Sequence, residues 1–437
     1  MAISFATLFV GLVLGVVDVR LLAGEGVENV ALRLDGREVA ELREPFAATV
    51  DLGCEPAPHE LVAVAYDAAG REVGRARQWL NRPRAAAEAT LVLEPGSGGT
   101  GRAARLTWRS LVADLPEVVD VTLDGAPVEV HDPARIELPP FEPAGTHVLR
   151  ASLDFGRGVS ASAELVFGSG AAVDAAAELT AVAIALEKGA ALPEADALAG
   201  WLEEGGVPLR VVAVEDPGAD VVVVAEGSAQ EGLRRDYERV SRAGCALSHP
   251  GGAFVRVDPD EDLRLRVLWP VATTSAQGDV VANAYPSTRW FERGRSSLDW
   301  IAGCRLDWPA WERTAQRIAD AVAVAGLAAA EGGRRRAVVL VLGPRARDAS
   351  RISPDEAIRF LGRLGVPLRV VSVGGGHSPE AARWRAAKPA IVGRGLAGEL
   401  RTLLEELGRQ RIAWVEGAHL PQAVALGPLA KGIRLVR

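Results

Sequence analysis

Three oxygen- or nitrogen-bearing side chains, those of Glu226, Ser228 and Gln230, lie in one short turn. The turn directly follows the valine run Val221–Val224, which predicts a short strand buried on both faces of a parallel sheet. The residues after the turn have helical spacing, so the turn lies at the carboxyl end of a central strand. That is where ligands bind in open α/β sheets. The turn contains no histidine or cysteine, so it predicts an architecture more firmly than an activity.

Length and composition limit the class of protein. The 437 residues suffice for about three domains of ~150 residues each. A hydrophobic content of 49% and a charged content of 24% are ordinary for a soluble globular protein. The net charge of −8 argues against a nucleic-acid partner, because phosphate backbones require a basic face. All but three of the 49 basic residues are arginine, which indicates a GC-rich coding bias.

The three cysteines, Cys54, Cys245 and Cys304, match no metal-binding spacing. Their odd number fits no complete disulfide framework. Cys245 and Cys304 are expected to be buried free thiols, with one bridge between them as the alternative.

Residues 1–169 contain a duplicated unit of about ninety residues. Val30–Gly36 recurs as Val119–Gly125, and the alternating pattern that begins at His59 recurs at His147. Alternating apolar and polar residues that run into an Asp-Gly dipeptide predict hairpins. The length of the unit is that of an immunoglobulin-like sandwich. A histidine in the same strand position of both copies favours a structural role over metal binding.

The Leu-Asp-Gly pattern and the later stretch Pro56–Gly70 resemble the immunoglobulin-like domains of bacterial secreted and surface proteins. The resemblance implies an extracytoplasmic location, in the periplasm or at the cell surface. Ile3–Val17 has the length of a signal-peptide core, but no Lys or Arg precedes it and it is too short for a membrane span. The repeat places Met1 at the start of the first sandwich, so cleavage would remove opening strands. The alternatives are a leader upstream of Met1 or a cytoplasmic location.

Beyond residue 170 the apolar period indicates alternating strands and helices. The predicted elements are a strand at Leu179–Leu186, a helix at Pro193–Glu204, a strand at Gly206–Val214, the valine strand with a helix to about Ala243, a hairpin of Ala253–Val257 and Leu263–Leu268, a helix at Trp311–Ala330, a strand at Ala337–Leu342, a helix at Pro354–Leu364, a strand at Leu368–Val373, a helix at Leu396–Gln410 and a strand at Ile412–Glu416. The hairpin follows because five intervening residues are too few for a parallel crossover. The string Gly206–Val214 recurs as Gly365–Val373, either by duplication or because one kind of joint is used twice.

A mostly parallel sheet with one hairpin after the first helix is the layout of the von Willebrand factor type A domain. The chain resembles that family in the version found in acidobacterial-type proteins, through Val221–Gln230, the hairpin, Arg336–Gly343 with Asp348–Ser350, and Gly408–Trp414. The predicted fold class is therefore multidomain, with two all-β immunoglobulin-like sandwiches followed by an α/β Rossmann-like domain with a mostly parallel sheet. The predicted domains are sandwiches at 1–83 and 84–169, a β-α-β connector packed on the last domain at 170–214, and a degenerate type A domain at 215–437.

The resemblance implies a metal-ion-dependent adhesion site, but the residues depart from its pattern. The family has Asp-x-Ser-x-Ser where this chain has Glu226-Gly-Ser228-Ala-Gln230. Thr273 or its neighbour could supply the family's threonine, and Asp348 lies five residues beyond the expected aspartate. Hard cations need several anionic oxygens, so too few charges remain. We expect a degenerate site with no metal or other cofactor.

The long segment from Thr273 to Trp311 is the candidate partner-binding surface. Trp, Tyr and Arg anchor protein interfaces, and long loops on rigid sheets often carry function. The alternative is a satellite core beneath the loop. The predicted partner-binding residues are Tyr285, Arg289, Trp290, Phe291, Arg293 and Trp300.

Two weaker constellations remain. Gly374–Glu380 opens a helix after a strand and could cradle a phosphate, but it lacks the Lys and Ser/Thr of a P-loop. Asp258–Asp262 is acidic but lacks the spacing of a Ca²⁺ loop. The sequence therefore predicts a non-catalytic protein-interaction or adhesion module without a transmembrane span. The alternative is an α/β enzyme or phosphate-ligand-binding protein that uses Gly374–Glu380 with His377.

Overall fold

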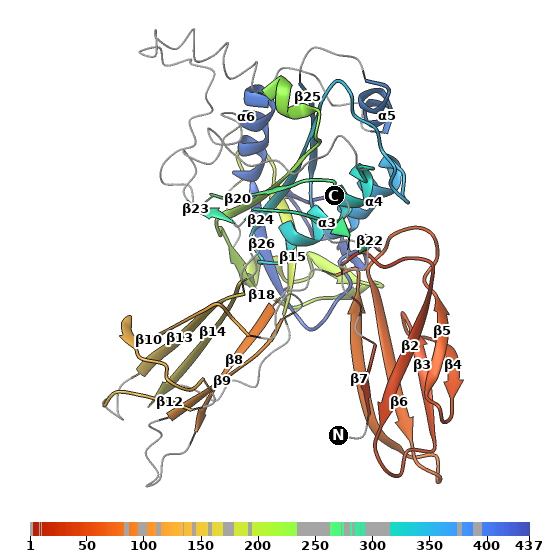
Figure 1. The fold of residues 1–437 in the computed structure, drawn as a ribbon, viewed down its shortest axis with the longest axis vertical. Helices are drawn as coiled ribbons and strands as arrows, with labels where there is room; N and C mark the ends of the chain where they lie inside the picture. Colours follow the sequence, from red (N-terminus) through yellow and green to blue (C-terminus); the bar gives the residue numbers. More distant parts are fainter. Residues whose placement is uncertain are drawn as a thin grey trace. The chain divides into compact units, whose positions relative to one another are not determined.

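The computed structural model contains several antiparallel sheets and one parallel sheet flanked by helices (Figure 1). It describes residues 3–7, 9, 11–82, 87–94, 103–110, 115–133, 135–141, 146–155, 160–168, 179–190, 195–233, 263–271, 273–274, 280–281, 285–288, 290–292, 315–373, 378–387 and 396–437. The chain divides into two compact units. The first comprises Met1–Pro83, Glu178–Pro286 and Phe291–Arg437, and the second comprises Arg84–Ala177 and Ser287–Trp290.

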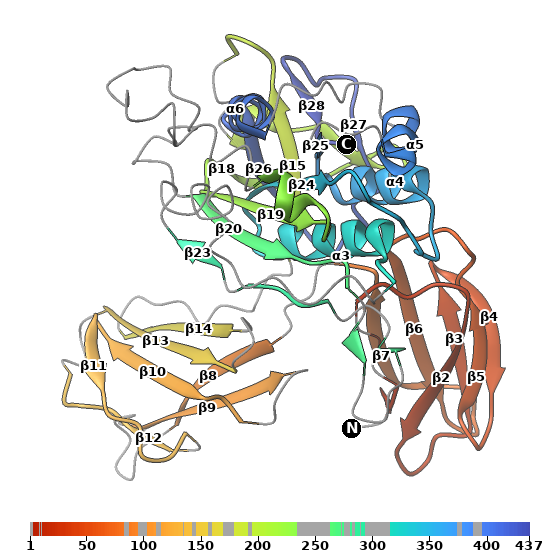
Figure 2. The same ribbon diagram turned by 45° about the horizontal axis from the view of Figure 1, so that its top comes forward.

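The first unit begins with a two-sheet β-sandwich (Figure 2). Its strands are β1 (Ile3–Phe5), β2 (Val16–Ala23), β3 (Asn29–Leu34), β4 (Arg37–Leu42), β5 (Ala47–Asp51), β6 (His59–Tyr66) and β7 (Glu72–Leu80). One sheet has the order β1-β2-β5 and the other β4-β3-β6-β7. Inward residues of both sheets, such as Val19, Leu32 and Leu61, share one buried core because their side chains alternate along each strand.

The second unit repeats this strand order. Its strands are β8 (Ala87–Glu94), β9 (Ala103–Ser110), β10 (Val118–Leu123), β11 (Ala126–Val128), β12 (Ile136–Glu137), β13 (Thr146–Asp154) and β14 (Ser160–Gly168). The sheets are β12-β9-β8 and β11-β10-β13-β14, so β8 to β14 take the places of β1 to β7 in order. The repeated sequence is thus a repeated strand arrangement around a separate core that includes Leu106 and Leu149.

Each sandwich ties its Asp-Gly hairpin to the following long strand through a histidine. Asp35 and Asp124 have φ angles of 50° and 51°, in the left-handed region that the turn requires. His59 Nδ1 lies 2.7 Å from Asp35 Oδ2, and His147 Nδ1 lies 2.7 Å from Asp124 Oδ2. The other carboxylate oxygen of each aspartate accepts a main-chain amide at 2.8 Å, from Glu60 and from the matching residue of the second copy. The histidines therefore have a local structural partner in both copies.

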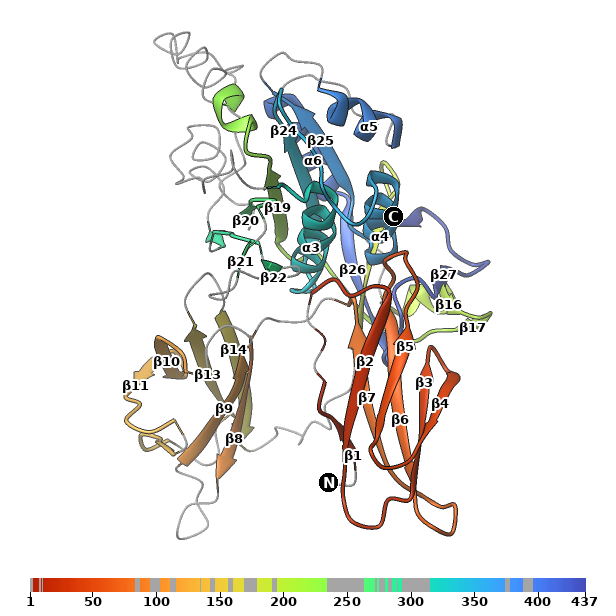
Figure 3. The same cartoon turned by 45° about the vertical axis from the view of Figure 1, so that its right-hand side comes forward.

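Two segments distant in sequence form a small antiparallel β body. Its elements are β15 (Leu179–Leu186), a 3₁₀ helix η1 (Ala195–Leu198), β16 (Leu202–Glu204), β17 (Val207–Pro208), β18 (Val211–Glu215), β26 (Gln410–Glu416), β27 (Val424–Leu426) and β28 (Ile433–Leu435). The sheets have the orders β18-β26-β15-β28 and β17-β16-β27. Strands β16, β17 and β27 of the second sheet are labelled in Figure 3. Residues from both segments, including Ile184, Leu202 and Val415, share one core.

This body corrects part of the predicted connector. The strand at Leu179–Leu186 was predicted correctly. The helix at Pro193–Glu204 was wrong, because its described part contains only the short η1 turn and then β16. The strands β15 and β18 do not pair with each other in a β-α-β unit, since each pairs antiparallel with β26.

The parallel sheet has the order β23-β20-β19-β24-β25. Its strands are β19 (Ala219–Ala225), β20 (Leu263–Leu268), β23 (Phe291–Glu292), β24 (Arg335–Leu342) and β25 (Leu368–Ser372), and its helices are α3 (Ile318–Ala330), α4 (Pro354–Leu364), α5 (Pro379–Ala387) and α6 (Leu396–Leu407). The valine run is buried on both faces, as predicted. Val221 and Val223 share a core with Leu403 of α6, while α3 and α4 cover the opposite face (Figure 2).

Three further expectations for the α/β part need correction or fall outside the structure. Ala253–Val257 lies outside the described residues, and the strand that pairs antiparallel with β20 is β23. The helix predicted from Trp311 begins at Ile318 within the described residues. The last strand, β26, joins the antiparallel body rather than the parallel sheet.

The two copies of the string Gly-Val-Pro-Leu-Arg-Val-Val have different structures. Gly365 ends α4 in the left-handed conformation, and the residues after it form the single parallel strand β25. Gly206 lies in the turn between β16 and β17, and the residues after it are split between β17 and β18. The same local sequence therefore takes its structure from its strand partners.

Candidate functional site

The turn after β19 packs directly on the end of the neighbouring strand β24. A Cβ atom at Gly343 would lie 2.2 Å from the carbonyl carbon of Ser228 and 2.4 Å from Ser228 Oγ. Real atoms do not approach that closely, so the main chains can meet only because residue 343 is glycine. The turn after β19 and the end of β24 are therefore in direct main-chain contact.

Glu226 lies at the centre of this edge and its side chain is completely buried. Its Oε1 accepts hydrogen bonds from Ser228 N at 2.8 Å and from Gln316 Nε2 at 2.8 Å. Its Oε2 accepts from Ser228 Oγ at 2.6 Å and from Gly343 N at 2.9 Å. Each carboxylate oxygen thus has two protein donors, which is the arrangement that stabilises a buried carboxylate.

Two neighbours complete the network. Gln316 Oε1 accepts a hydrogen bond from Gly227 N at 2.9 Å, so one amide group satisfies both the carboxylate and the main chain of the turn. Ser228 Oγ, which donates to Glu226, accepts from Arg345 N at 3.0 Å. Gln316 could not be predicted from the sequence, because a lone glutamine two residues before a helix has no distinctive pattern.

Asp348, the last of the predicted metal-site positions, accepts hydrogen bonds from the start of helix α3. Its Oδ1 accepts from Ile318 N at 2.8 Å and its Oδ2 from Ala319 N at 3.3 Å. The residue before α3, Arg317, has no side-chain cap of its own, so Asp348 supplies the cap from another segment. Ser350 adds a hydrogen bond from Asp320 N at 3.0 Å.

The buried Asp320 of α3 in turn accepts hydrogen bonds from the residues that follow Ser350. Its Oδ1 accepts from Arg351 N at 3.1 Å and from Ile352 N at 3.3 Å, and its Oδ2 pairs with Arg351 Nε at 3.3 Å. The Asp348 loop and the first turn of α3 are therefore linked in both directions. Asp348 does not contact Glu226 in any described hydrogen bond, so the structure does not bring these two carboxylates together as ligands.

Thr273 and Tyr285 lie on the segments that follow β20. Thr273 lies in β21 (Thr273–Thr274), which pairs with β22 (Val280–Val281). The hydroxyl of Tyr285 is buried and has no hydrogen-bond partner among the described residues. Burial raises the pKa of Tyr285 well above its usual range, and the negative charge of Asp320 raises it further. The phenol is therefore neutral beside the start of α3.

The predicted partner-binding residues are described only in part. Arg289, Arg293 and Trp300 lie outside the described residues. Tyr285 and Phe291 belong to the first unit and Trp290 to the second. The described ones among Tyr285–Trp290 are half-buried.

The predicted phosphate turn is described only at its end. Gly374–His377 lies outside the described residues. Ser378 is buried and its Oγ accepts from Ala381 N at 3.0 Å, so it caps α5. Glu380 is buried and pairs with Arg383 at 2.9 Å. Asp258–Asp262 also lies outside the described residues.

No group of three or more His, Cys, Asp or Glu residues within the described ranges could hold a metal ion. None of the helices in that part of the chain combines the length and the apolar character needed to cross a membrane. Cys54 is an exposed free thiol, while Cys245 and Cys304 lie outside these ranges.

Comparisons with known proteins give weak structural likenesses. No family model and no curated protein matches the chain. Proximal thread matrix protein 1 from the mussel byssus, with a zinc-occupied MIDAS motif, is 15% identical at a TM-score of 0.26, over 45% of this chain and 48% of that one. The chain thus spans about half the length of the mussel protein. Manganese-loaded TRAP protein of Plasmodium vivax is 12% identical at a TM-score of 0.25, over 48% of this chain and 80% of that one.

A third likeness concerns the sandwiches. The fibronectin(III)-like modules of Clostridium thermocellum CbhA are 17% identical at a TM-score of 0.16, over 18% of this chain and 92% of that one. At these TM-scores the likenesses carry no argument about what the chain does.

Proposed function

We propose that this chain is a non-catalytic protein-interaction or adhesion module whose α/β domain is a degenerate type A domain. In this proposal an internal hydrogen-bond network takes the place of a divalent cation at the carboxyl edge of the parallel sheet. The chain then acts through its surface, in an extracytoplasmic location, and not through bound-ion or group-transfer chemistry.

The observation that carries the proposal is the saturation of Glu226. A hard cation needs free oxygen lone pairs from several ligands. Four hydrogen bonds from Ser228, Gln316 and Gly343 already occupy the two oxygens of Glu226. Binding of an ion would break several of these buried bonds, and each broken bond leaves an unsatisfied group that costs about 1–3 kcal/mol. Asp348 is likewise engaged by helix α3.

The proposed partner is a protein, and the segment Tyr285–Phe291 is the proposed contact region. It lies between β20 and α3 in the sequence and contains the aromatic residues Tyr285, Trp290 and Phe291. Aromatic and arginine side chains on such connecting segments are typical anchors of interfaces. The acidic net charge of −8 favours a partner with a basic contact surface over nucleic acid.

Partner capture with and without metal tests the proposal. The full chain, immobilised and exposed to an extract of its native cells, should retain the same partner in EDTA and in Mg²⁺. Trp290→Ala should lose that partner without lowering the melting temperature, while Trp79→Ala on the first sandwich is the matched control. Retention that requires Mg²⁺ or Mn²⁺, or a rise of the melting temperature with either ion, would contradict the proposed loss of the ion site.

A further inference from the structure

A pocket of about 260 Å³ lies at the opposite edge of the parallel sheet from Glu226. Its lining includes Arg336, near the start of β24, and Gly365, which follows α4 and precedes β25. Both positions lie at the amino ends of parallel strands, whereas Glu226 follows the carboxyl end of β19. The pocket is therefore separate from the site discussed above, and it does not depend on the proposed function.

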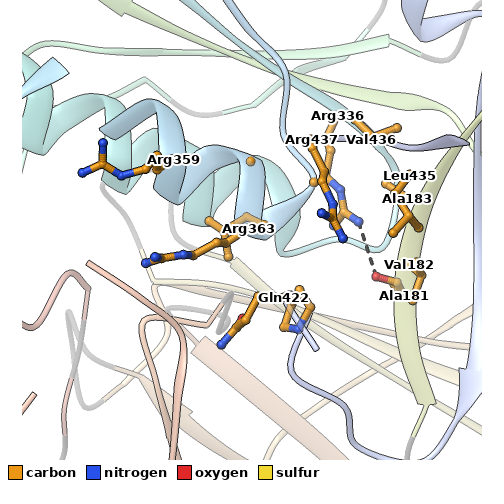
Figure 4. Close-up of a pocket in the computed structure, with 14 residues that line it drawn as sticks. Ala181, Val182, Ala183, Arg336, Arg359, Arg363, Gln422, Leu435, Val436 and Arg437 are labelled. Atoms are coloured by element: carbon orange, nitrogen blue, oxygen red, sulfur yellow. Dashed lines mark hydrogen bonds between the residues drawn. The ribbon is translucent and has the colours of Figure 1, made fainter. Parts of the chain in front are cut away.

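Arg336 provides a buried positive charge in this pocket. The residue is 3% exposed, and its guanidinium donates to two main-chain carbonyls, those of Ala330 at 3.2 Å and Ala181 at 3.4 Å (Figure 4). Its Nε is buried and has no hydrogen-bond partner among the described residues. Burial lowers the pKa of Arg336 to about 10, so the side chain is still a cation at neutral pH.

No carboxylate of the described residues forms an ion pair with Arg336. Asp220, which acts on it through its charge, is itself paired with Arg264 at 2.6 Å and with Arg334 at 2.9 Å. A buried cation without an anionic partner is costly, because carbonyl dipoles replace only part of its lost hydration. An anion that enters the pocket would supply the missing charge.

A second guanidinium faces the same space. Arg437 extends toward Arg336 in Figure 4, and its described hydrogen bond is a long one of 3.4 Å to the carbonyl of Val424. Two like charges that line one small pocket repel each other unless an anion shares the pocket with them. Arg359 and Arg363 of α4 also line the pocket but point away from this pair.

The two arginines of α4 that line the pocket are bound to the carboxylate of Glu55. Arg359 Nε binds Glu55 Oε1 at 2.7 Å, and Arg363 binds the same oxygen at 3.2 Å. Glu55 therefore neutralises part of the charge of Arg359 and Arg363. Arg336 and Arg437 form no ion pair with a carboxylate side chain of the described residues, so they are the arginines that an anion in the pocket would neutralise.

The pocket lining also contains a hydrogen-bond acceptor, the side-chain oxygen of Gln422. Gln422 Nε2 donates to the carbonyl of Pro58 at 2.9 Å, while Gln422 Oε1 is buried without a hydrogen-bond partner among the described residues. An oxyanion that also carries a proton, as hydrogenphosphate does, could satisfy both the guanidinium donors and this acceptor. A carboxylate with a neighbouring hydroxyl would do the same.

We propose that this pocket binds a small oxyanion, a phosphate or carboxylate group, between Arg336 and Arg437. Charge-assisted hydrogen bonds to guanidinium are the strongest that a neutral-pH site offers, and their forked geometry matches such groups. The pocket volume suits a small anion or the anionic end of a small molecule rather than a drug-sized ligand.

Isothermal titration of the full chain with inorganic phosphate, at constant ionic strength set by NaCl, tests the proposal. We expect saturable binding at one site. Arg437→Gln should weaken it about tenfold or more, because one charge-assisted contact is lost. Arg385→Gln on α5, an exposed arginine away from the pocket, is the matched control and should titrate like the wild type. Titrations with sulfate, acetate and lactate identify the group that binds. Stronger binding of phosphate than of sulfate supports a hydrogen bond from hydrogenphosphate to Gln422 Oε1. Binding of acetate or lactate identifies a carboxylate ligand.

Arg336→Gln should abolish phosphate binding if the variant folds. If it does not fold, the Arg437→Gln titration alone tests the proposal. Phosphate, sulfate, acetate and lactate that all bind no better than chloride would overturn the proposal. So would Arg437→Gln that binds phosphate as the wild type does.

Discussion

Gln316 Nε2 and Glu226 Oε1 are joined by a hydrogen bond of 2.8 Å across 90 positions of the sequence. Both residues are buried, and the same glutamine amide also accepts from Gly227 N. The turn after β19 is thus held by a neutral side chain from the segment before α3. This pairing explains why a carboxylate can stay buried at the edge of the sheet without a cation in the proposed arrangement.

Replacement of Gln316 by alanine should destabilise the protein. It leaves one acceptor position of Glu226 and the amide of Gly227 unsatisfied, at a cost of about 1–3 kcal/mol for each buried group. Urea unfolding followed by circular dichroism measures the loss. Glu231→Ala, at an exposed residue just after the turn of Glu226, is the control. An unfolding midpoint unchanged by Gln316→Ala would show that the network contributes nothing.

Gly343→Ala should be more damaging than an ordinary glycine substitution. The added Cβ would lie 2.2 Å from the main chain of Ser228, and backbone cannot move aside as a flexible side chain can. Overpacking of this kind costs about 1–3 kcal/mol or more. At Gly408 the nearest atom to an added Cβ is 3.4 Å away, so Gly408→Ala is the control and should change the melting temperature little. Equal effects of the two substitutions would contradict the close approach.

Asp348→Ala should weaken helix α3, because the carboxylate supplies the cap that Arg317 lacks. Loss of such a cap costs about 0.5–2 kcal/mol. Asp348→Asn keeps one acceptor and should cost less. Asp355→Asn is the comparison, since α4 has its own capping box from Ser353 and Glu356. The melting temperature, followed by far-UV circular dichroism, should fall most for Asp348→Ala, less for Asp348→Asn and least for Asp355→Asn.

The two sandwiches should lose stability in acid through their hairpin aspartates. Burial would raise the pKa of Asp35, but hydrogen bonds from His59 and from Glu60 N outweigh it and lower the pKa below its usual value. The hydrogen bond from His147 and then that from Val148 N lower the pKa of Asp124. A carboxylate with a depressed folded pKa stabilises the fold above its unfolded value of 3.8, and this contribution is lost as pH falls through the folded pKa.

Asp35→Asn and Asp124→Asn should therefore be less stable than the wild type at pH 6 and should approach it at pH 2–3. Melting temperatures of the three proteins across this range measure the effect. Asp51→Asn, an exposed aspartate of β5, controls for general charge removal. A difference that stays constant from pH 6 to pH 2 would mean that the carboxylate charge is not the cause.

Local pattern was enough to predict much of the fold. Period-2 alternation and the Asp-Gly turns predicted the hairpins of both sandwiches, and the repeat predicted that β8 to β14 follow β1 to β7. The valine run predicted the buried central strand β19. These features depend on neighbours in sequence, since side-chain period and turn geometry are set within a few residues.

The pairing of strands and of polar side chains that are distant in sequence could be learned only from the tertiary structure. The strand β26 joins β15 and β18 instead of the parallel sheet, and the two copies of Gly-Val-Pro-Leu-Arg-Val-Val take different structures. Gln316 meets Glu226, and Arg437 reaches the space beside Arg336, only after the chain has folded. The sequence by itself determined which residues form buried strands and tight turns. The tertiary structure decided which polar groups meet, because a hydrogen bond across many tens of residues is selected by packing and leaves no periodic trace in the chain.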